Sequence, residues 1–347
     1  MSSSDRIEQK QSGNEATASS LEEHTVRSGG AQMAPVGEPP IHAEILAALE
    51  AYPQLDFSEE VLAVARTRPQ LDAIPEPYPQ PVMRLIPGAA GAPDVRLFIV
   101  DPEPGTTGRP VLLHLHGGGY LMQNPGHFPI IQTIAQRCGC VVVSVDYRLA
   151  PETIYPGALD DNYAALEWVY RNADSLGVDR TRIAVGGESA GGGHAAALAL
   201  RARDRQEVPI LFQMLIYPML DDRTGSTHRI PAHMGRHIWN ETSNRFAWSA
   251  LLGVPAGSEE VLPGSVPGRV ENLAGLPPTW LGTGALDLFA DETIAYARRL
   301  LHAGVPTELA VYPGGYHAFD LIAPDASISK RFRGEWLGAL QRAFARA

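Results

Sequence analysis

Residues 182–193 read RIAVGGESAGGG, in which a strand-like run passes through a glycine-flanked serine into a helix-like run. The stretch RIAVG is mostly apolar and is expected to form a buried strand, and the alanine-rich segment Ala190–Arg203 is expected to form a helix. A serine on a strained turn between strand and helix needs small neighbours, and the turn lifts its hydroxyl above the edge of the sheet. We therefore interpret 187–191, GESAG, as a nucleophile elbow centred on Ser189 rather than as a tight turn of purely structural importance.

Other short runs rich in β-branched and apolar residues are also expected to be strands: 81–86, 95–100, 111–116, 141–147, 210–217, 279–284 and 307–313. Amphipathic, helix-like segments separate most of the later runs: 130–137, 159–173, 190–203, 291–302 and 329–345. Apolar strands that alternate with helices indicate a mostly parallel sheet covered on both faces. The first two runs have no helix between them, so they are expected to pair as an antiparallel hairpin. The sequence thus predicts a doubly wound α/β domain.

Two segments interrupt this alternation and are interpreted as parts of one cap. Within 41–75, apolar residues at helical spacing predict two short helices broken near Pro53. Residues 218–278 form an insertion with polar and aromatic side chains, and insertions of that length usually cover a site. The catalytic domain would then comprise 76–217 and 279–347.

Composition and charge restrict the expected partners and compartment. The chain has 347 residues with 39 acidic and 28 basic side chains, a net charge of −11, which disfavours binding to nucleic acid or to anionic membranes. Residues 1–40 are rich in Ser, Gly, Glu and Gln and are expected to form a disordered tail without a secretory signal. Cys138 and Cys140 are interpreted as buried thiols in a reducing compartment. Since no apolar stretch is long enough to span a bilayer, a cytoplasmic protein without a membrane span is expected.

A second motif, HGGGY at 116–120, follows the third expected strand. Three successive glycines allow backbone N–H groups to turn toward a site that side chains would obstruct, as the oxyanion of a tetrahedral intermediate requires. A flexible loop and a phosphate-binding loop are the alternatives. Phosphate loops usually continue with Lys, Ser or Thr, whereas here Tyr120 is followed by Leu121 and Met122. We therefore interpret the motif as part of an oxyanion hole.

A nucleophilic serine needs a base, and the base needs a carboxylate that orients it. His317 lies just after the last expected strand and is the candidate base. Asp287 follows the penultimate strand and is the candidate acid, whereas Asp291 and Glu292 fit better as acids in the first turn of the next helix. The order Ser189, Asp287, His317 along the chain is that of the α/β-hydrolase arrangement.

Other histidines are given no catalytic role. His114 and His116 lie at the inner end of a strand and are interpreted as structural. His228, His233 and His237 fall in the insertion, where a solvated surface is favoured over the lining of a substrate entrance.

Together, these motifs resemble those of the hormone-sensitive lipase-like esterases, also called bacterial family IV, over about residues 42–345. The resemblance rests on HGGGY at 116–120, DYRLAPE at 146–152, GESAGG at 187–192 and the sequences around Asp287 and His317. It implies an α/β-hydrolase fold, with a mostly parallel eight-stranded sheet flanked by helices and a mainly helical cap. Two positions depart from the family pattern: Glu188 stands where Asp is common, and Asp287-Leu-Phe stands where Asp-Pro-Leu is usual.

The resemblance also assigns roles to residues around the serine. The N–H groups of Gly118, Gly119 and Ala190 would form the oxyanion hole. His116, Gly117 and Glu188 would support it, and the DYRLAPE segment would brace the oxyanion loop by hydrogen bonds and salt bridges.

The implied function is that of a serine carboxylesterase that hydrolyses small esters with short to medium acyl chains through an acyl-enzyme, without a metal or an organic cofactor. Lactone or carbamate hydrolysis on the same triad, and a non-catalytic small-molecule receptor on the same scaffold, are the alternatives. A dehydrogenase is disfavoured, because no G-x-G-x-x-G opens a helix after the first strand. The sequence leaves the oligomeric state open, a homodimer included.

Overall fold

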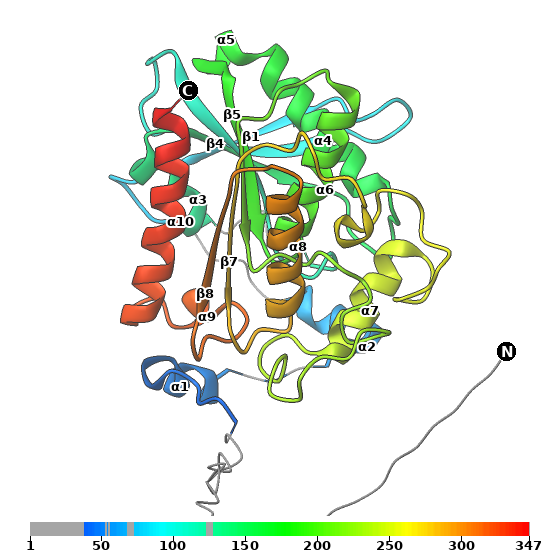
Figure 1. Cartoon of the computed structure of the whole chain (residues 1–347). Coiled ribbons are helices and arrows are strands. Elements are labelled where there is room, and N and C mark those ends of the chain that lie inside the picture. Colours follow the sequence, from blue (N-terminus) through cyan, green and yellow to red (C-terminus); the bar gives the residue numbers. More distant parts are fainter. Residues whose placement is uncertain (1–37, 53, 55, 68–72, 123–127, 347) are drawn as a thin grey trace, which may run out of the picture. The chain divides into compact units, whose positions relative to one another are not determined.

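The central element of the fold is one sheet of eight strands in the order β1-β2-β4-β3-β5-β6-β7-β8 (Figure 1). The computed structural model describes residues 38–346 except 53, 55, 68–72 and 123–127. The expected disordered tail, 1–40, therefore lies almost wholly outside the described residues. The strands are β1 (Pro81–Ile86), β2 (Val95–Val100), β3 (Arg109–Leu115), β4 (Val141–Asp146), β5 (Val178–Glu188), β6 (Phe212–Ile216), β7 (Thr279–Gly284) and β8 (Thr307–Tyr312).

The strand directions confirm the predicted α/β-hydrolase sheet. β1 and β2 form the expected antiparallel hairpin, and β2 also runs antiparallel to β4. All other neighbouring strands are parallel. Since parallel strands end at the same edge of a sheet, the loops that follow β3, β5, β7 and β8 meet at one edge.

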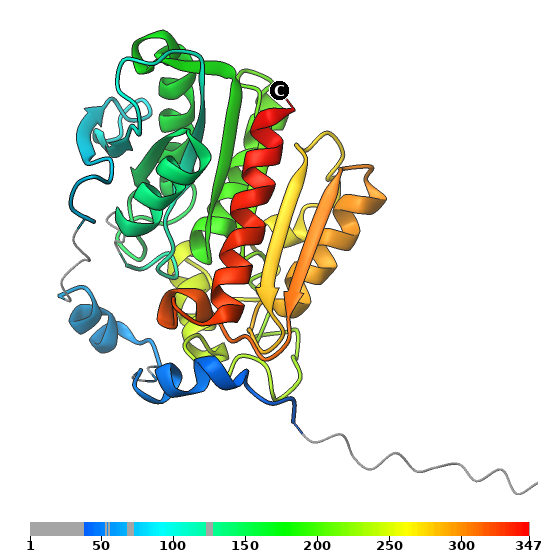
Figure 2. The same cartoon turned by 90° about the vertical axis from the view of Figure 1, so that its left-hand side faces the viewer.

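Helices cover both faces of the sheet. α3 (Phe128–Cys138) and α10 (Ser327–Ala345) pack on one face, as Figure 2 shows for α10. The opposite face is covered by α4 (Gly157–Arg171), α6 (Ala190–Arg205) and α8 (Ala290–His302), with the short α5 (Ala173–Leu176) after α4. Successive strand residues point to opposite faces of the sheet and so contribute to two apolar cores. Leu112 packs in the core beneath α3 and α10, and Leu113 packs in the core beneath α4, α6 and α8. None of the described helices is long and apolar enough to cross a membrane.

The two segments expected to form a cap contain helices that lie outside the sheet. α1 (Ala43–Glu50) and α2 (Glu59–Ala65) belong to the first, and α7 (Glu241–Leu252) and the 3-10 turn Pro267–Arg269 belong to the second. In Figure 2, α1, drawn in dark blue, lies beyond the arrowheads of β7 and β8, at the carboxyl end of the strands. The two segments are joined by a hydrogen bond of 3.0 Å from the Phe57 N–H to the Ser243 hydroxyl.

The two cysteines are free thiols, but only one of them is buried as expected. Cys140 is buried, whereas Cys138, the last residue of α3, is half-buried. The difference arises because Gly139 takes a left-handed conformation (φ 59°) and ends the helix near the surface.

Candidate active site

Ser189 occupies the turn between β5 and α6, with φ 56° and ψ −119°. A non-glycine residue in this region of backbone space is strained and must be held by its surroundings. Three backbone hydrogen bonds hold it: Ser189 N–H donates to the Ile216 carbonyl over 2.8 Å, and the Ser189 carbonyl accepts from the N–H groups of Met219 (3.0 Å) and Gly193 (3.1 Å). The strand–turn–helix context that the sequence predicts is therefore present.

The glycines beside Ser189 allow β5 and α6 to approach β3 closely. A β-carbon added to Gly187 or to Gly191 would lie 1.9 Å from the Leu115 carbonyl oxygen, which is closer than any real contact. These two positions therefore require glycine for steric reasons.

Ser189, His317 and Asp287 form a continuous chain of hydrogen bonds. His317 Nε2 lies 3.0 Å from Ser189 Oγ, and His317 Nδ1 lies 2.9 Å from Asp287 Oδ2. All three residues are buried, and only Ser189 and His317 retain some exposure, at 8% and 5%. The other oxygen of Asp287 accepts the Phe289 N–H over 3.0 Å, which fixes the carboxylate. In this geometry the imidazole can accept the serine proton while the carboxylate holds its tautomer.

Two aromatic rings enclose the imidazole of His317. Tyr217 and Phe289 contact it edge to face, with ring centroids at 5.0 and 5.2 Å. They limit the rotation of the imidazole and restrict the access of water on two sides.

The glycine loop after β3 lies directly against the serine turn. A β-carbon added to Gly117 would fall 3.0 Å from the Glu188 carbonyl oxygen. The loop then turns through left-handed backbone at Gly118, Gly119 and Tyr120, with φ of 118°, 62° and 65°. In the described part of the chain no carbonyl accepts the N–H of Gly118 or Gly119. Those donors are thus free to bind a developing negative charge.

The segment 146–152 braces this loop, as the resemblance implies. The Tyr147 hydroxyl donates to the His116 carbonyl over 2.6 Å, and the imidazole of His116 stacks on the Tyr147 ring at 4.2 Å. The Ala150 N–H donates to the Tyr120 carbonyl over 3.0 Å.

Beneath the serine, Glu188 contacts His114 rather than solvent. His114 Nε2 lies 3.1 Å from a Glu188 oxygen, and Nδ1 lies 3.0 Å from the Ser144 hydroxyl. All three residues are buried. Glu188 therefore helps to tie β5, which carries the serine, to β3, which leads into the glycine loop.

Glu292 has a role that its sequence position did not reveal. It lies in the first turn of α8, as expected, but it is buried and accepts hydrogen bonds from the Leu220 N–H (2.6 Å) and the Thr224 hydroxyl. Burial raises the pKa of its carboxyl well above the usual range. Glu292 thus fixes the start of the insertion 218–278 to α8.

Asp320, in the short helix α9 (Phe319–Ile322), is a second buried carboxyl that the sequence did not single out. Burial is the main cause that raises its pKa to about 7, against the opposing effect of the Tyr217 hydroxyl beside it. In an unfolded chain the pKa would be about 3.9. The proton held by the folded protein stabilises it at low pH, and this contribution is lost as the pH rises from about 4 through about 7.

We therefore expect Asp320→Asn to raise the melting temperature relative to the wild type, and to raise it more at about pH 8 than at about pH 5. Differential scanning calorimetry at the two pH values measures both differences. Asp325→Asn is the matched control, because the Asp325 side chain is 98% exposed and its replacement should give no pH-dependent difference. A shift for Asp320→Asn that is the same at both pH values would contradict the assignment.

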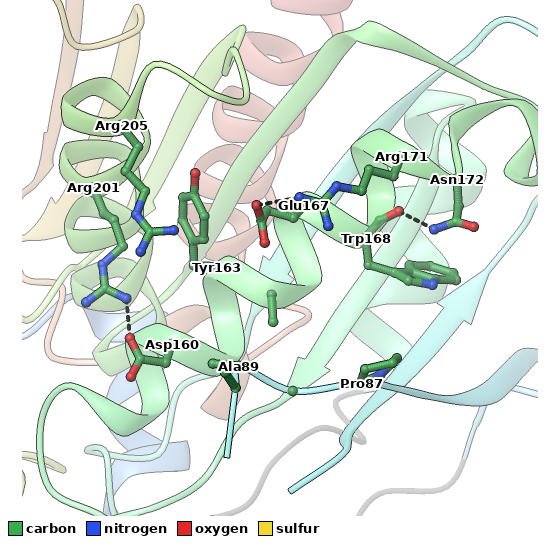
Figure 3. Close-up of a pocket in the computed structure, with 13 residues that line it drawn as sticks. Pro87, Ala89, Asp160, Tyr163, Glu167, Trp168, Arg171, Asn172, Arg201 and Arg205 are labelled. Carbon is green, nitrogen blue, oxygen red and sulfur yellow. Dashed lines mark hydrogen bonds and ion pairs between the residues drawn. The ribbon is translucent and has the colours of Figure 1, made fainter. Parts of the chain in front are cut away.

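A hollow of about 330 Å³ lies away from this site, between α4, α6 and the turn after β1 (Figure 3). Each of its three guanidinium groups has a carboxylate partner: Arg201 contacts Asp160 at 2.5 Å, Arg171 contacts Glu167 at 2.9 Å, and Arg205 lies 3.7 Å from Glu207. Because carboxylates lie beside all three cations, these arginines offer no unmatched charge to a ligand.

The sequence matches the family model described as alpha/beta hydrolase fold over residues 112–321. It is 35% identical over 317 residues to carboxylesterase NlhH of Mycobacterium tuberculosis, which covers 89% of this chain and 98% of that protein. It is also 33% identical over 229 residues to the ethyl acetate hydrolase of Pseudomonas putida, which covers 65% of this chain and 70% of that protein.

Solved structures of esterases have the same fold. A bacterial heroin esterase superposes with a TM-score of 0.79 at 36% identity, over 88% of this chain and 99% of that chain. Esterase LipW from Mycobacterium marinum gives a TM-score of 0.69 at 35% identity, over 88% and 92% of the two chains. The chain therefore belongs to the hormone-sensitive lipase-like carboxylic ester hydrolases of the alpha/beta hydrolase fold family.

Proposed function

We propose that the protein is a serine carboxylesterase that hydrolyses esters with short to medium acyl chains through an acyl-enzyme intermediate. Ser189 is the nucleophile, His317 the general base and acid, and Asp287 the residue that orients the imidazole. The observation that carries this proposal is the continuous hydrogen-bond chain from Ser189 Oγ through both nitrogens of His317 to Asp287.

The first half of the reaction transfers the acyl group to the enzyme. Ser189 Oγ attacks the ester carbonyl carbon while His317 Nε2 takes the hydroxyl proton. The N–H groups of Gly118, Gly119 and Ala190 donate to the resulting oxyanion. When the tetrahedral intermediate collapses, the bond to the alcohol oxygen breaks and His317 returns the proton to the leaving alcohol.

The second half releases the acyl group. A water molecule gives a proton to His317 as its oxygen attacks the acyl carbon, and the same N–H groups stabilise the second oxyanion. The bond to Ser189 Oγ then breaks, the serine regains its proton from His317, and the carboxylic acid leaves.

We further propose a division of the chain into a catalytic domain, 76–217 with 279–347, and a cap, 41–75 with 218–278. The hydrogen bond between Phe57 and Ser243 supports the grouping of the two cap segments. A shared apolar cluster supports it too, because Phe57 and Trp239 pack with rings 5.4 Å apart.

The preference for short acyl chains is supported by a tryptophan that packs on the oxyanion loop. A β-carbon added to Gly119 would fall 2.2 Å from Cη2 of Trp239, so the indole lies against the backbone of that glycine. Trp239 is 5% exposed and its Nε1–H donates to Asn244 over 3.2 Å, which fixes the ring. A relative, the ethyl acetate hydrolase, is named for an ester with a short acyl group.

We expect Trp239→Leu to shift the acyl preference toward longer chains. The smaller side chain opens space beside Gly119, so the ratio of kcat/KM for p-nitrophenyl octanoate to that for the acetate should rise by about tenfold. Trp336→Leu is the control for a general loss of packing, because Trp336 is also buried but lies in α10. An unchanged ratio in Trp239→Leu, or an equal rise in the control, would contradict the proposal that the indole limits the length of the acyl chain.

Covalent labelling tests the proposed function directly. A fluorophosphonate should react with one equivalent of enzyme, abolish hydrolysis of p-nitrophenyl butyrate, and modify the tryptic peptide that contains Ser189. A receptor on this scaffold would bind ligands without turnover, and a lactone or carbamate hydrolase would be labelled but would turn over those substrates faster than the ester. Labelling at another residue, or esterase activity that survives full labelling of Ser189, would refute the proposal.

A further inference from the structure

Arg66 stands at the carboxyl end of α2, in the first cap segment, and points toward the catalytic domain. Its N–H closes the helix on the Leu62 carbonyl over 3.0 Å, so the backbone of Arg66 is fixed to α2. Leu62 itself is buried in the apolar cluster that contains Tyr120 and Leu121 of the glycine loop.

The guanidinium of Arg66 bonds to three residues of the catalytic domain. Nε donates to the Leu121 carbonyl over 2.8 Å, and Nη2 donates to the Ala150 carbonyl over 2.8 Å. Nη1 and Nη2 also form a forked ion pair with Glu152, at 2.6 and 3.0 Å. Only a planar guanidinium can direct donors to these acceptors at once; a lysine ammonium could not span them.

The two carbonyls belong to the segments that shape the oxyanion loop. Leu121 directly follows the left-handed run Gly118–Tyr120, and its N–H donates to the Gly118 carbonyl over 3.1 Å. Ala150 binds the loop from the other side, through its N–H to the Tyr120 carbonyl. Arg66 therefore joins Ala150 to Leu121, the residue after Tyr120, and closes a ring of hydrogen bonds beside Tyr120.

Tyr120 adds a reason for such external bracing. With φ 65° it is a non-glycine residue in left-handed backbone, a conformation that relaxes unless its neighbours hold it. If the loop relaxed, the N–H groups of Gly118 and Gly119 would turn away from the carbonyl oxygen of the substrate.

We propose that Arg66 is a positioning residue for ester hydrolysis, which holds the oxyanion loop through the Leu121 and Ala150 carbonyls and makes the rate depend on the position of α2. This inference rests on the proposed function, since it requires an oxyanion at Gly118 and Gly119. Arg66 acts through the loop rather than on the substrate, so it should affect the transition state and leave substrate binding nearly unaltered.

Arg66→Ala should lower kcat for p-nitrophenyl butyrate by about 10- to 100-fold and change KM by less than about threefold. The affinity for an alkyl trifluoromethyl ketone, which forms a tetrahedral adduct with the serine, should fall by a factor similar to that in kcat. Glu152→Gln keeps both carbonyl contacts of Arg66, so its fall in kcat should be smaller than that of Arg66→Ala.

Arg269→Ala is the matched control for the loss of a bridging arginine. Arg269 also uses all three nitrogens, on the Asp222 carboxylate and the Ser258 carbonyl, and its side chain is 19% exposed against 28% for Arg66. It braces the second cap segment without contacting the oxyanion loop, so its removal should lower the melting temperature without the fall in kcat.

The outcomes separate this inference from the proposed function. Unchanged kcat and unchanged ketone affinity in Arg66→Ala, a rise in KM alone, or an equal fall in kcat for Arg269→Ala would each overturn the positioning role while the wild type remains an esterase. A wild type that neither turns over esters nor reacts with fluorophosphonate would instead refute the proposed function.

If Arg66→Ala does not fold, the variant Arg66→Lys is tested in its place. A fall in kcat of at least about threefold at constant KM supports the role, and an unchanged kcat overturns it.

Discussion

Replacing Ser189 with alanine is expected to lower kcat/KM for p-nitrophenyl butyrate by about 10⁴-fold or more, with little change in the free energy of unfolding. The activity is lost because the variant has no oxygen that can attack the ester carbonyl. The fold should persist because alanine has a β-carbon like serine, so the backbone at φ 56° is no more strained than before. Among the described residues, the side-chain hydrogen bond that the variant loses is the one to His317.

A second variant, His317→Ala, tests whether Ser189 and His317 act together. His317→Ala should cause a loss of similar size, and the double variant Ser189→Ala/His317→Ala should be little worse than either, because nucleophile and base act as one unit. Multiplicative losses would show that the two residues act independently. Hydrolysis by Ser189→Ala at more than about one hundredth of the wild-type rate would place the nucleophile elsewhere.

Gly191→Ala is expected to have the largest effect on stability, a loss of about 3 kcal/mol or more in the free energy of unfolding. The added β-carbon would meet the Leu115 carbonyl oxygen at 1.9 Å and the His116 carbonyl oxygen at 2.7 Å. Both obstacles are backbone atoms of the strand that leads into the oxyanion loop, so no side chain can rotate away. α6 would have to move from β3, which also misplaces Ser189 at its amino end.

Urea denaturation followed by circular dichroism measures this loss, with Gly334→Ala as the matched control. Gly334 lies in α10, is exposed, and has no atom within 4 Å of an added β-carbon. The same substitution there should raise the free energy of unfolding by about 0.5 to 1 kcal/mol, because alanine favours the helix. A stable, active Gly191→Ala enzyme would show that α6 and β3 are not packed as closely as described.

The fold could be predicted from the sequence because its strands are apolar runs in a regular order. β1, β2 and β7 begin and end at the expected residues. The other strands differ by one or two residues at an end, and β5 differs most: its local pattern predicts a start at Arg182, whereas the strand begins at Val178. The polar run Asp179–Thr181 has no strand signal of its own and joins β5 only through the pairing of Val178 with Arg109. Val178 and Arg109 are distant in the sequence, so the local pattern of residues around Val178 cannot predict that they pair.

The candidate site shows the same limit. Ser189, Asp287 and His317 were recognisable because each stands in a local motif after a strand, and the roles given to them remain predictions. Arg66 and Trp239 gave no signal, because what they do depends on carbonyls and glycines in other parts of the chain. Arg66 is 55 residues from Leu121 and 84 residues from Ala150, the two residues whose carbonyls it binds. A lone arginine after a short helix is ordinary in sequence.

The order of the site residues along the chain bears on when activity arises during synthesis. The ribosome makes Ser189 128 residues before His317, and Asp287 30 residues before it. On the proposed function, a nascent chain that has completed β5 and α6 already carries the nucleophile but not the base that accepts its proton. We therefore expect hydrolysis to begin only after β8 has joined the edge of the sheet and His317 has followed it.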